Sequence, residues 1–231
     1  RGFHGFKGRK WATEPGNLHL VVHFGPQAEI DRFEVAFTVL AALSVADALA
    51  QIAGLEEEAR IKWVNDILLA EAKVGGVLAY TQTQGKVVTS AILGMGVNLE
   101  TTPDVAPTPF VPTVASVRDF LPPGIPDMAG GFLRSLLTAL DRNYRALLED
   151  GASALIQRYR ERSMVVGEEV TVCSEDSDRT LRVVGEGRVH KLGEDLELYL
   201  DGRAEPVRSG RLILGRASHR IDASSAGAGN F

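Results

Sequence analysis

Residues 61–78, IKWVNDILLAEAKVGGVL, place polar side chains inside a strand-like pattern, and this stretch constrains the fold of the chain most. Lys62, Asn65, Asp66 and Lys73 lie between two apolar runs that are typical of strands. Burying such groups costs free energy unless they find partners, so they either face water or hold a ligand. Asn and Asp are also common turn residues, because their side chains bond the local backbone. The stretch therefore predicts two strands joined by a turn at residues 65 and 66.

Two pairs of glycines lie in, or at the end of, neighbouring strand-like runs. Gly75 and Gly76 follow Lys73 inside one run, where glycine normally lowers strand stability. They indicate that another group approaches the backbone there. Gly94 and Gly96 end a second run, LGMGVN, which lacks the helix and the third glycine of a dinucleotide-binding fingerprint. This second pair is consistent with a tight packing site for a flat ligand.

The first residues, RGFHGFKGRKW, form a glycine-rich basic segment without periodicity, which is typical of a loop. Gly5 and Gly8 let the backbone approach a ligand closely, and Lys7, Arg9 and Lys10 supply positive charge. Loops of this kind suit phosphate groups. A solvated surface loop is the alternative interpretation.

Hydrophobic periodicity predicts strands and helices over residues 1–163. Residues 17–24 alternate apolar and polar side chains, as a half-buried strand does. Asp31 and Glu34 have the spacing of a capping box, so a helix is expected from Asp31 to a stop near Gly54. Further strands are expected at 61–64, 74–80 and 86–93, the last two joined by a turn at Gly85, and helices near 116–120, over 132–147 and around Ile156 and Tyr159.

The pattern changes after Arg162. Short apolar runs separated by glycine or acidic turns continue to residue 214 and predict a small β-barrel or sandwich. The chain is therefore expected to contain a larger domain over 1–163, a small β domain over 164–215 and a flexible tail over 216–231, where small and polar residues dominate.

Composition excludes several classes of protein. The 30 acidic residues outnumber the 25 basic ones, giving a net charge of −5, so no overall positive field recruits nucleic acid or anionic lipid. The single cysteine, Cys173, cannot form an internal disulfide, and a reducing, cytoplasmic location is expected. No uninterrupted apolar run reaches the ~18 residues of a membrane span, and no signal peptide is visible.

The order of four motifs resembles the biotin protein ligases of the biotin/lipoate A/B ligase superfamily. The motifs are Gly-Arg-Lys-Trp at 8–11, Lys-Trp-x-Asn-Asp-Ile at 62–67, Lys-x-x-Gly-Val-Leu at 73–78 and Gly-x-Gly-x-Asn at 94–98. The resemblance implies an α+β fold of the class II synthetase type, with a mixed, largely antiparallel sheet backed by helices, and a small SH3-like barrel at the C-terminal end. It also implies that ATP and biotin form biotinyl-5'-AMP, with Mg²⁺ on the phosphates. The biotinyl group is then transferred to a lysine of the biotin carboxyl carrier domain of a carboxylase.

The same resemblance assigns roles to individual residues. Lys73 corresponds to the lysine that contacts the biotin carboxylate and the α-phosphate, and Lys62 and Asp66 complete the catalytic set. Asn65 and Asp66 are candidates for positioning the metal, and Trp11 is expected to stack on adenine. The remaining cofactor-binding residues implied by the motifs are Gly5, Lys7, Gly8, Arg9, Gly75, Gly76, Gly96 and Asn98.

The chain departs from the family pattern in three ways. His4, Phe6 and Lys7 stand where the family has arginines, and an apolar ring cannot donate hydrogen bonds to phosphate. Val64 replaces a customary proline. A Ser-Thr-Asn motif and a glutamine, which precede the basic loop in the family, are not found before Arg1. We therefore expect a fragment, a chain that lost these elements or, less readily, a circular permutation involving the tail.

Several alternatives remain open from the sequence. A ligase for lipoate or octanoate would share the fold, and a non-catalytic biotin- or adenylate-binding homologue would explain Phe6 and His4. A purely structural role for the polar residues is the least favoured hypothesis. No helix-turn-helix segment precedes the catalytic region, so DNA binding is not expected. Unpaired strand edges leave a homodimer as an alternative to a monomer.

Overall fold

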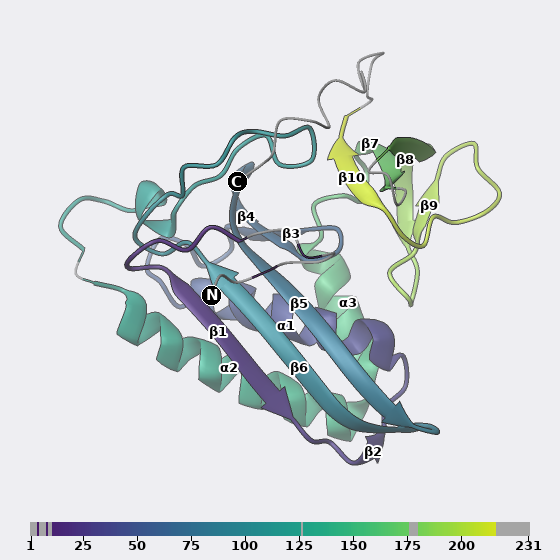
Figure 1. Cartoon of the computed structure of the whole chain (residues 1–231), viewed down its shortest axis with the longest axis horizontal. Coiled ribbons are helices and arrows are strands. Elements are labelled where there is room, and N and C mark those ends of the chain that lie inside the picture. The colour runs from purple at the N-terminus through teal and green to yellow at the C-terminus, as the bar shows by residue number, and fades with distance from the viewer. Residues whose placement is uncertain (1–3, 5–7, 9–10, 126, 176–179, 216–231) are drawn as a thin grey trace.

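A computed structural model describes residues 4, 8, 11–125, 127–175 and 180–215 (Figure 1). Its main sheet has the strand order β1-β6-β5-β4-β3, with the short β2 also paired to β6, and every ladder in it is antiparallel. The strands are β1 (Leu18–Phe24), β2 (Ala28–Glu29), β3 (Ala59–Lys62), β4 (Asp66–Leu69), β5 (Ala72–Gln84) and β6 (Val87–Val97).

Three helices lie on one face of this sheet, as Figure 1 shows. They are α1 (Phe33–Leu49), α2 (Ala129–Asp150) and α3 (Ala152–Arg162), and a short 3-10 helix, η2 (Val117–Phe120), precedes α2. Helix α1 packs directly on the strands and is covered on its other side by α2 and α3. This position explains why α1 is buried almost all round, whereas α2 keeps a polar outer face. In the described part of the chain, no helix lies on the other face of β1, β6 and β5.

The C-terminal strands form a second antiparallel sheet of order β10-β7-β8-β9. Its members are β7 (Glu169–Glu175), β8 (Leu181–Leu192), β9 (Leu198–Leu200) and β10 (Arg211–Leu214). The predicted α+β architecture, with antiparallel sheet backed by helices, is thus confirmed. Within the described part of the C-terminal region the strands do not close into the barrel that the resemblance implied.

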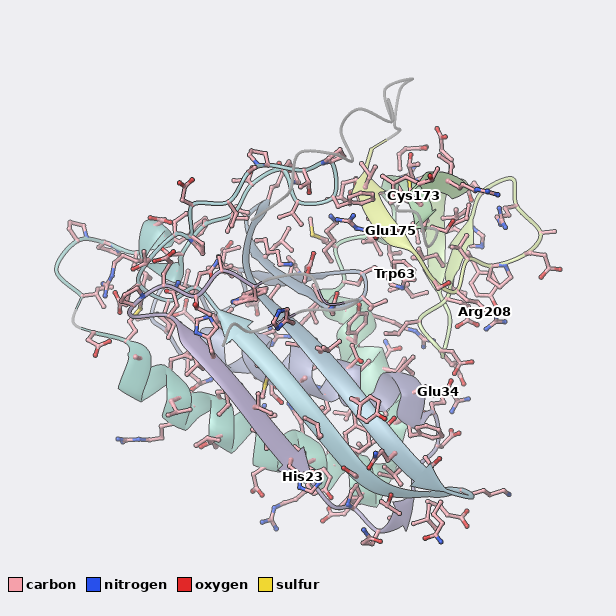
Figure 2. The ribbon with its side chains drawn as sticks, in the orientation of Figure 1. His23, Glu34, Trp63, Cys173, Glu175 and Arg208 are labelled. Atoms are coloured by element: carbon pink, nitrogen blue, oxygen red, sulfur yellow. The ribbon has the colours of Figure 1, made fainter. Side chains whose placement is uncertain are left out.

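Trp63 and Arg32 contact the C-terminal part of the chain. Trp63, at the end of β3, donates its indole N–H to the carbonyl of Leu196 at 2.7 Å, and it is 6% exposed. Figure 2 shows Trp63 between the main sheet and the C-terminal strands. Arg32 forms ion pairs with Glu194 and Asp195 of the same C-terminal loop. These contacts fix the C-terminal sheet against the β3 end of the main sheet.

The predicted start of the first helix was wrong. The helix begins at Phe33, and its N-cap residue Arg32 is in the left-handed region with φ of 52° and no side-chain capping bond. Asp31 instead accepts a hydrogen bond from the Arg32 guanidinium. The helix ends at Leu49, before the predicted stop at Gly54. Asp31 and Glu34 have the spacing of a capping box, but Asp31 lies before the N-cap residue and pairs with Arg32.

Other local predictions are confirmed. The β5–β6 turn contains Gly85 with φ of 61°, and Gly151, with φ of 79°, separates α2 from α3. The short helix near residue 117 carries a capping box formed by Ser116 and Asp119. Among the described helices, none has the length and apolarity needed to cross a membrane.

Candidate functional site

The turn between β3 and β4 positions the first two site residues. Lys62 and Asp66 are paired across the hairpin, and Asp66 is paired with Gly76 on its other side. Tyr159 of α3, fully buried, donates its hydroxyl hydrogen to the carbonyl of Val64 at 2.9 Å. Helix α3 therefore supports this turn at Val64, the residue that stands where the family pattern has proline.

Asn65 is committed to the same turn. Its side-chain amide donates to the Val77 carbonyl at 2.6 Å, and the Val77 amide donates to the Asn65 carbonyl at 3.0 Å. These bonds join the turn to β5, so Asn65 acts in the structure as a turn residue that fixes Asp66. Asn65 does not line the cavity described next.

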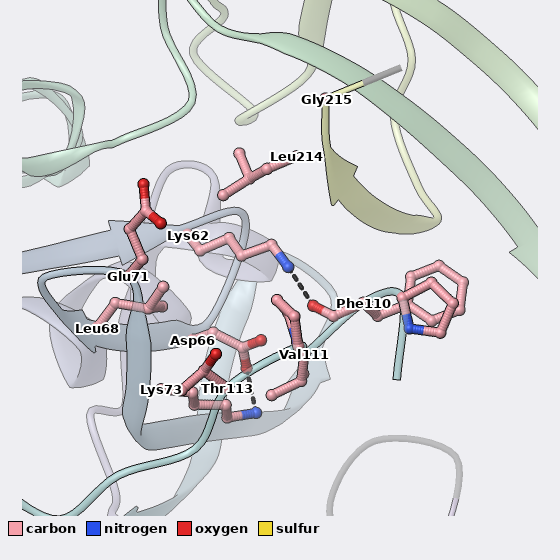
Figure 3. A pocket seen from close by; sticks show the side chains of 12 residues that line it. Lys62, Asp66, Leu68, Glu71, Lys73, Phe110, Val111, Thr113, Leu214 and Gly215 are labelled. Atoms are coloured by element: carbon pink, nitrogen blue, oxygen red, sulfur yellow. Dashed lines mark hydrogen bonds and ion pairs between the residues drawn. The ribbon is translucent and has the colours of Figure 1, made fainter. Parts of the chain in front are cut away.

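Lys62, Asp66 and Lys73 converge on one cavity of about 340 Å³. Figure 3 shows both lysine side chains extending toward it, Lys62 to the carbonyl of Phe110 and Lys73 to the carboxylate of Asp66. The Lys73–Asp66 ion pair measures 2.5 Å. The remaining walls come from the 109–113 loop, from Leu68 and Glu71 and from the end of β10, at Leu214 and Gly215.

Burial sets the electrostatics of Lys62. The residue is 5% exposed, and desolvation is the main cause that lowers its pKa below the ordinary value. Asp66 acts in the opposite direction, while Lys73 and Arg211 lower the pKa further. A buried ammonium with other cations nearby gains free energy when an anion enters. The cavity is therefore suited to a negatively charged ligand.

The glycine pairs accommodate Trp11. A Cβ on Gly96 would lie 2.6 Å from the Trp11 indole, and one on Gly76 would lie 3.0 Å from it. The indole N–H donates to His19 Nε2 at 3.0 Å, and the Lys73 ammonium lies 5.4 Å from the ring centroid. Burial lowers the pKa of His19, which favours the neutral ring whose Nε2 can accept this bond. The group that approaches the glycine backbone in this structure is thus the chain's own indole.

Gly75 and Asn98, two further predicted site residues, make packing and hydrogen-bond contacts within the protein. A Cβ on Gly75 would lie 3.0 Å from the Gly96 carbonyl oxygen and 3.5 Å from the Ile67 Cβ, so strand packing requires glycine there. Asn98 is 2% exposed and donates its side-chain amide to the Ala115 carbonyl at 3.1 Å. Its side-chain oxygen is buried and has no hydrogen-bond partner in the described part of the chain.

The basic loop is only partly described. Gly8 has φ of 72°, which favours glycine, and it is exposed. Gly5, Lys7 and Arg9 lie outside the described residues, and so do Phe6 and the predicted tail over 216–231.

The cavity offers part of a magnesium site, namely two carboxylates. Mg²⁺ usually binds one or two carboxylates and completes its shell with water and substrate phosphates. Asp66 and Glu71 offer such carboxylates at the cavity. Across the described ranges, no group of three or more His, Cys, Asp or Glu side chains could hold a metal by itself. The donor set thus suits a metal that arrives with phosphate.

Several residues that line the cavity were not predicted from the sequence. Pro109, Phe110 and Thr113 belong to the segment that follows Asn98 and ends before η2, which has no predicted site residue, and Leu214 and Gly215 belong to the end of the C-terminal sheet. Nothing in the local pattern distinguishes them, because they reach the site through chain crossings between distant segments. Backbone bonds from Lys73 to Thr113 and from Ala115 to Lys73, at 3.0 Å each, bring the loop there.

Comparison with known proteins supports the resemblance. Residues 2–98 match the family model described as the biotin/lipoate A/B protein ligase family. A biotin–[acetyl-CoA-carboxylase] ligase from Paracoccus denitrificans is 36% identical over 101 residues, 43% of this chain and 41% of that protein. The bifunctional ligase/repressor BirA of Bacillus subtilis is 28% identical over 144 residues, 62% of this chain and 43% of that protein. The matches thus span about two fifths of the length of these relatives.

The fold has close counterparts among solved structures. The biotin protein ligase from Aquifex aeolicus in complex with biotin and ATP superposes with a TM-score of 0.70 and 22% identity, covering 93% of this chain and 84% of that one. At this identity the likeness establishes the fold alone. Together these matches confirm the resemblance inferred from the four motifs. The expectation that the chain does not bind DNA stays a prediction, since one relative is also a repressor.

Proposed function

We propose that this chain, whose residues 2–98 match the biotin/lipoate A/B protein ligase family, is an ATP-dependent biotin protein ligase. It would join biotin and ATP to form biotinyl-5'-AMP and transfer the biotinyl group to a lysine of a biotin carboxyl carrier domain. One observation carries the proposal: Lys62 and Lys73 converge on a single cavity of about 340 Å³, beside the surface of Gly76 and Gly96.

The first step brings two anions together, and the lysines oppose their repulsion. A carboxylate oxygen of biotin forms a bond to the α-phosphorus of ATP, and pyrophosphate leaves with the electrons of the broken P–O bond. Lys73 lies between the cavity and the Trp11 indole, so its ammonium can face both the carboxylate and the α-phosphate. Fixed charges in a partly dry site stabilise the developing charge more than water does.

Lys62 and Asp66 serve the same step in different ways. Lys62 is held by the Phe110 carbonyl inside the cavity, where it can face the phosphates. Asp66 pairs with Lys73 at 2.5 Å and so orients that ammonium. We assign to Asp66, with Glu71, the contact to Mg²⁺, which would neutralise phosphate charge when bound. In the transfer step the carrier lysine attacks the acyl carbon and AMP leaves.

The outer face of β1, β6 and β5 is the proposed surface for the acid. On this face the register places Val21 beside Gly94, and His23, Ile92 and Tyr80 in one row. Val21, Ile92 and Tyr80 are 57%, 40% and 59% exposed, so apolar area is available next to the Trp11 surface. This apolar area also favours the alternative of a lipoate or octanoate ligase, because an alkyl chain needs no polar partners.

Residues of both the main sheet and the C-terminal sheet line the cavity. We propose residues 1–163 as the catalytic domain and 164–215 as an SH3-like C-terminal domain that completes the cavity through Leu214 and Gly215. Strand β1 lies at the edge of the main sheet. A homodimer through this edge remains part of the proposal, because edge strands present unpaired backbone groups.

The test is biotin-dependent exchange of pyrophosphate with ATP. Lys73→Ala should lower the exchange rate by about 10² or more if the ammonium stabilises developing charge. Lys86→Ala, which removes an exposed lysine of the β5–β6 hairpin, is the matched control and should keep the wild-type rate.

The choice of acid is tested in parallel. Thermal denaturation with ATP and either biotin, lipoate or octanoate shows which acid stabilises the protein, since only a bound ligand raises the melting temperature. Exchange with octanoate but not biotin would replace the proposal by its alternative. Biotin binding without exchange or carrier labelling would instead indicate a non-catalytic homologue.

A further inference from the structure

A second hollow, here called the α3–β8 groove, lies between helix α3 and the end of strand β8. It has a volume of about 320 Å³. Its lining residues are Gln157, Arg160 and Glu161 of α3, Val166 of the following linker, and His190, Lys191 and Leu192 of β8. None of them lines the cavity that contains the two site lysines. The groove is therefore a separate place on the molecule, with a size found among small-molecule sites.

Arg160 differs from the two other arginines of the same helix. Arg158 and Arg162 both pair with the carboxylate of Asp47, at 2.7 Å and 3.2 Å. Arg160 has no ion pair with any described residue, and its Nε is buried without a hydrogen-bond partner. A buried N–H group that has lost its water costs free energy unless an acceptor replaces that water. The protein thus leaves the Arg160 guanidinium without the partner that its neighbours have.

Lys191 brings a second positive charge to the groove from β8. Its ammonium lies 5.5 Å from the ring centroid of Tyr199, and it forms no ion pair within the described ranges. Glu161, the carboxylate of the groove, accepts a hydrogen bond from Gln157 at 3.1 Å and pairs with neither cation in the described structure. The lining therefore has two unpaired cations against one carboxylate. Such a balance of charge attracts an anion.

The rest of the lining is apolar or already engaged. The Nδ1 atom of His190 lies 3.1 Å from the carboxylate of Asp201, so that carboxylate holds the imidazole. Val166 is 44% exposed and Leu192 is 2% exposed, so both open and buried apolar surface belongs to the same groove. A guanidinium and an ammonium recognise phosphate oxygens, whereas apolar surface favours a carbon skeleton. The combination suits a small molecule that carries a phosphate and an apolar part.

We propose that the α3–β8 groove is a binding site for a small organic phosphate, whose phosphoryl group Arg160 and Lys191 hold. The apolar part of the ligand lies on Val166. The inference does not rest on the proposed function, because the groove and the lysine-lined cavity share no lining residue. A ligand in the groove contacts both α3 and β8, and its binding raises the melting temperature of the protein.

Calorimetry with phenyl phosphate, inorganic phosphate and phenol, each without ATP or biotin, tests the site. Phenyl phosphate should bind more tightly than the other two probes, because only phenyl phosphate uses both the cations and the apolar surface. Its affinity should fall as salt is added, since the two cations are partly exposed to solvent.

Single substitutions assign the binding to the groove. Arg160→Gln and Lys191→Gln should each weaken phenyl phosphate about 10-fold, the loss of one hydrogen-bonded charge, and Arg160→Lys should recover part of the affinity. Val166→Ser should weaken phenyl phosphate but leave inorganic phosphate unchanged. Arg134→Gln is the matched control, because Arg134 is an exposed arginine of α2 outside the groove. Lys73→Ala reports separately on any binding to the lysine-lined cavity.

Each outcome decides for or against the site. Wild-type affinity for phenyl phosphate in Arg160→Gln, with or without a lower melting temperature, would give that arginine a structural role only and overturn the inference. Loss of binding in Lys73→Ala instead would place the phosphate in the lysine-lined cavity and overturn it as well. So would equal affinities for phenyl phosphate and inorganic phosphate, or no binding of either. The expected losses in a protein without biotin-dependent exchange would uphold the groove and refute the ligase proposal.

Discussion

Replacing Asp47 by Asn should destabilise the helix layer, because this one carboxylate holds three arginines. Asp47 lies on α1 with a side chain that is 9% exposed. Its Oδ2 accepts hydrogen bonds from Arg142 at 2.6 Å and from Arg158 at 2.7 Å, and its Oδ1 accepts one from Arg162 at 3.2 Å. Asn143, fully buried, also donates to it. The group therefore ties α1 to both α2 and α3.

The size of the effect follows from burial. Removing one partner of a buried ion pair costs about 3–5 kcal/mol, because the other charge is left without compensation. The arginine side chains are 59%, 37% and 27% exposed, so water screens them and lowers the expected loss to about 2–4 kcal/mol. Asn keeps the shape and one acceptor oxygen, but its amide group would face a guanidinium. For a chain of this length the melting temperature should fall by about 2–4 °C per kcal/mol.

Urea and thermal denaturation followed by circular dichroism measure this loss. Asp141→Asn is the matched control, because Asp141 pairs with Arg145 on the surface of α2, where both side chains are mostly exposed. The control should keep the wild-type melting temperature. If Asp47→Asn were no less stable than Asp141→Asn, or if salt removed the difference completely, the network would be a set of screened surface pairs and the reasoning would be wrong.

Two further predictions concern the cavity and the surface beside it. Burial lowers the pKa of Lys62 below its ordinary value of 10.5. Between these two pKa values the unfolded chain binds a proton that the folded chain does not. The free energy of unfolding therefore rises with pH in this window. Lys62→Met should lack this rise in urea denaturation at alkaline pH, and parallel curves for the two proteins would contradict it. Gly96→Ala should displace the Trp11 indole, since its Cβ would lie 2.6 Å away, and should shift tryptophan fluorescence to longer wavelength. Gly94→Ala, whose Cβ would meet only the Leu78 carbonyl at 4.0 Å, should leave the emission unchanged.

Local sequence patterns predicted much of the fold. Apolar alternation over residues 17–24 identified β1, and helical spacing identified α2 and α3 with Gly151 between them. The four motifs identified the family resemblance and placed Lys62, Asp66 and Lys73 close together. These features are local in sequence, and side-chain period and turn chemistry determine them directly.

Local sequence patterns gave incomplete or wrong predictions at positions that contact distant segments of the chain. The Asp31–Glu34 spacing predicted a capping box, yet the N-cap residue is Arg32, whose side chain forms ion pairs with the C-terminal loop. Residues 66–69 form a strand of their own, β4, between the strands expected at 61–64 and 74–80. The glycines at 76 and 96 were expected to leave room for a ligand, and the indole of Trp11 occupies that surface.

The sequence by itself determined the order of the elements and the chemical types of the site: two lysines, an aspartate and glycines that allow close approach. Tertiary structure alone decided that the 109–113 loop and the end of the C-terminal strand β10 line the cavity, and that the Arg211 guanidinium lies over the ring of Phe110. The physical reason is that side-chain periodicity reports which face of an element is apolar. The register and the crossings that bring distant elements together depend on the summed packing of the whole chain.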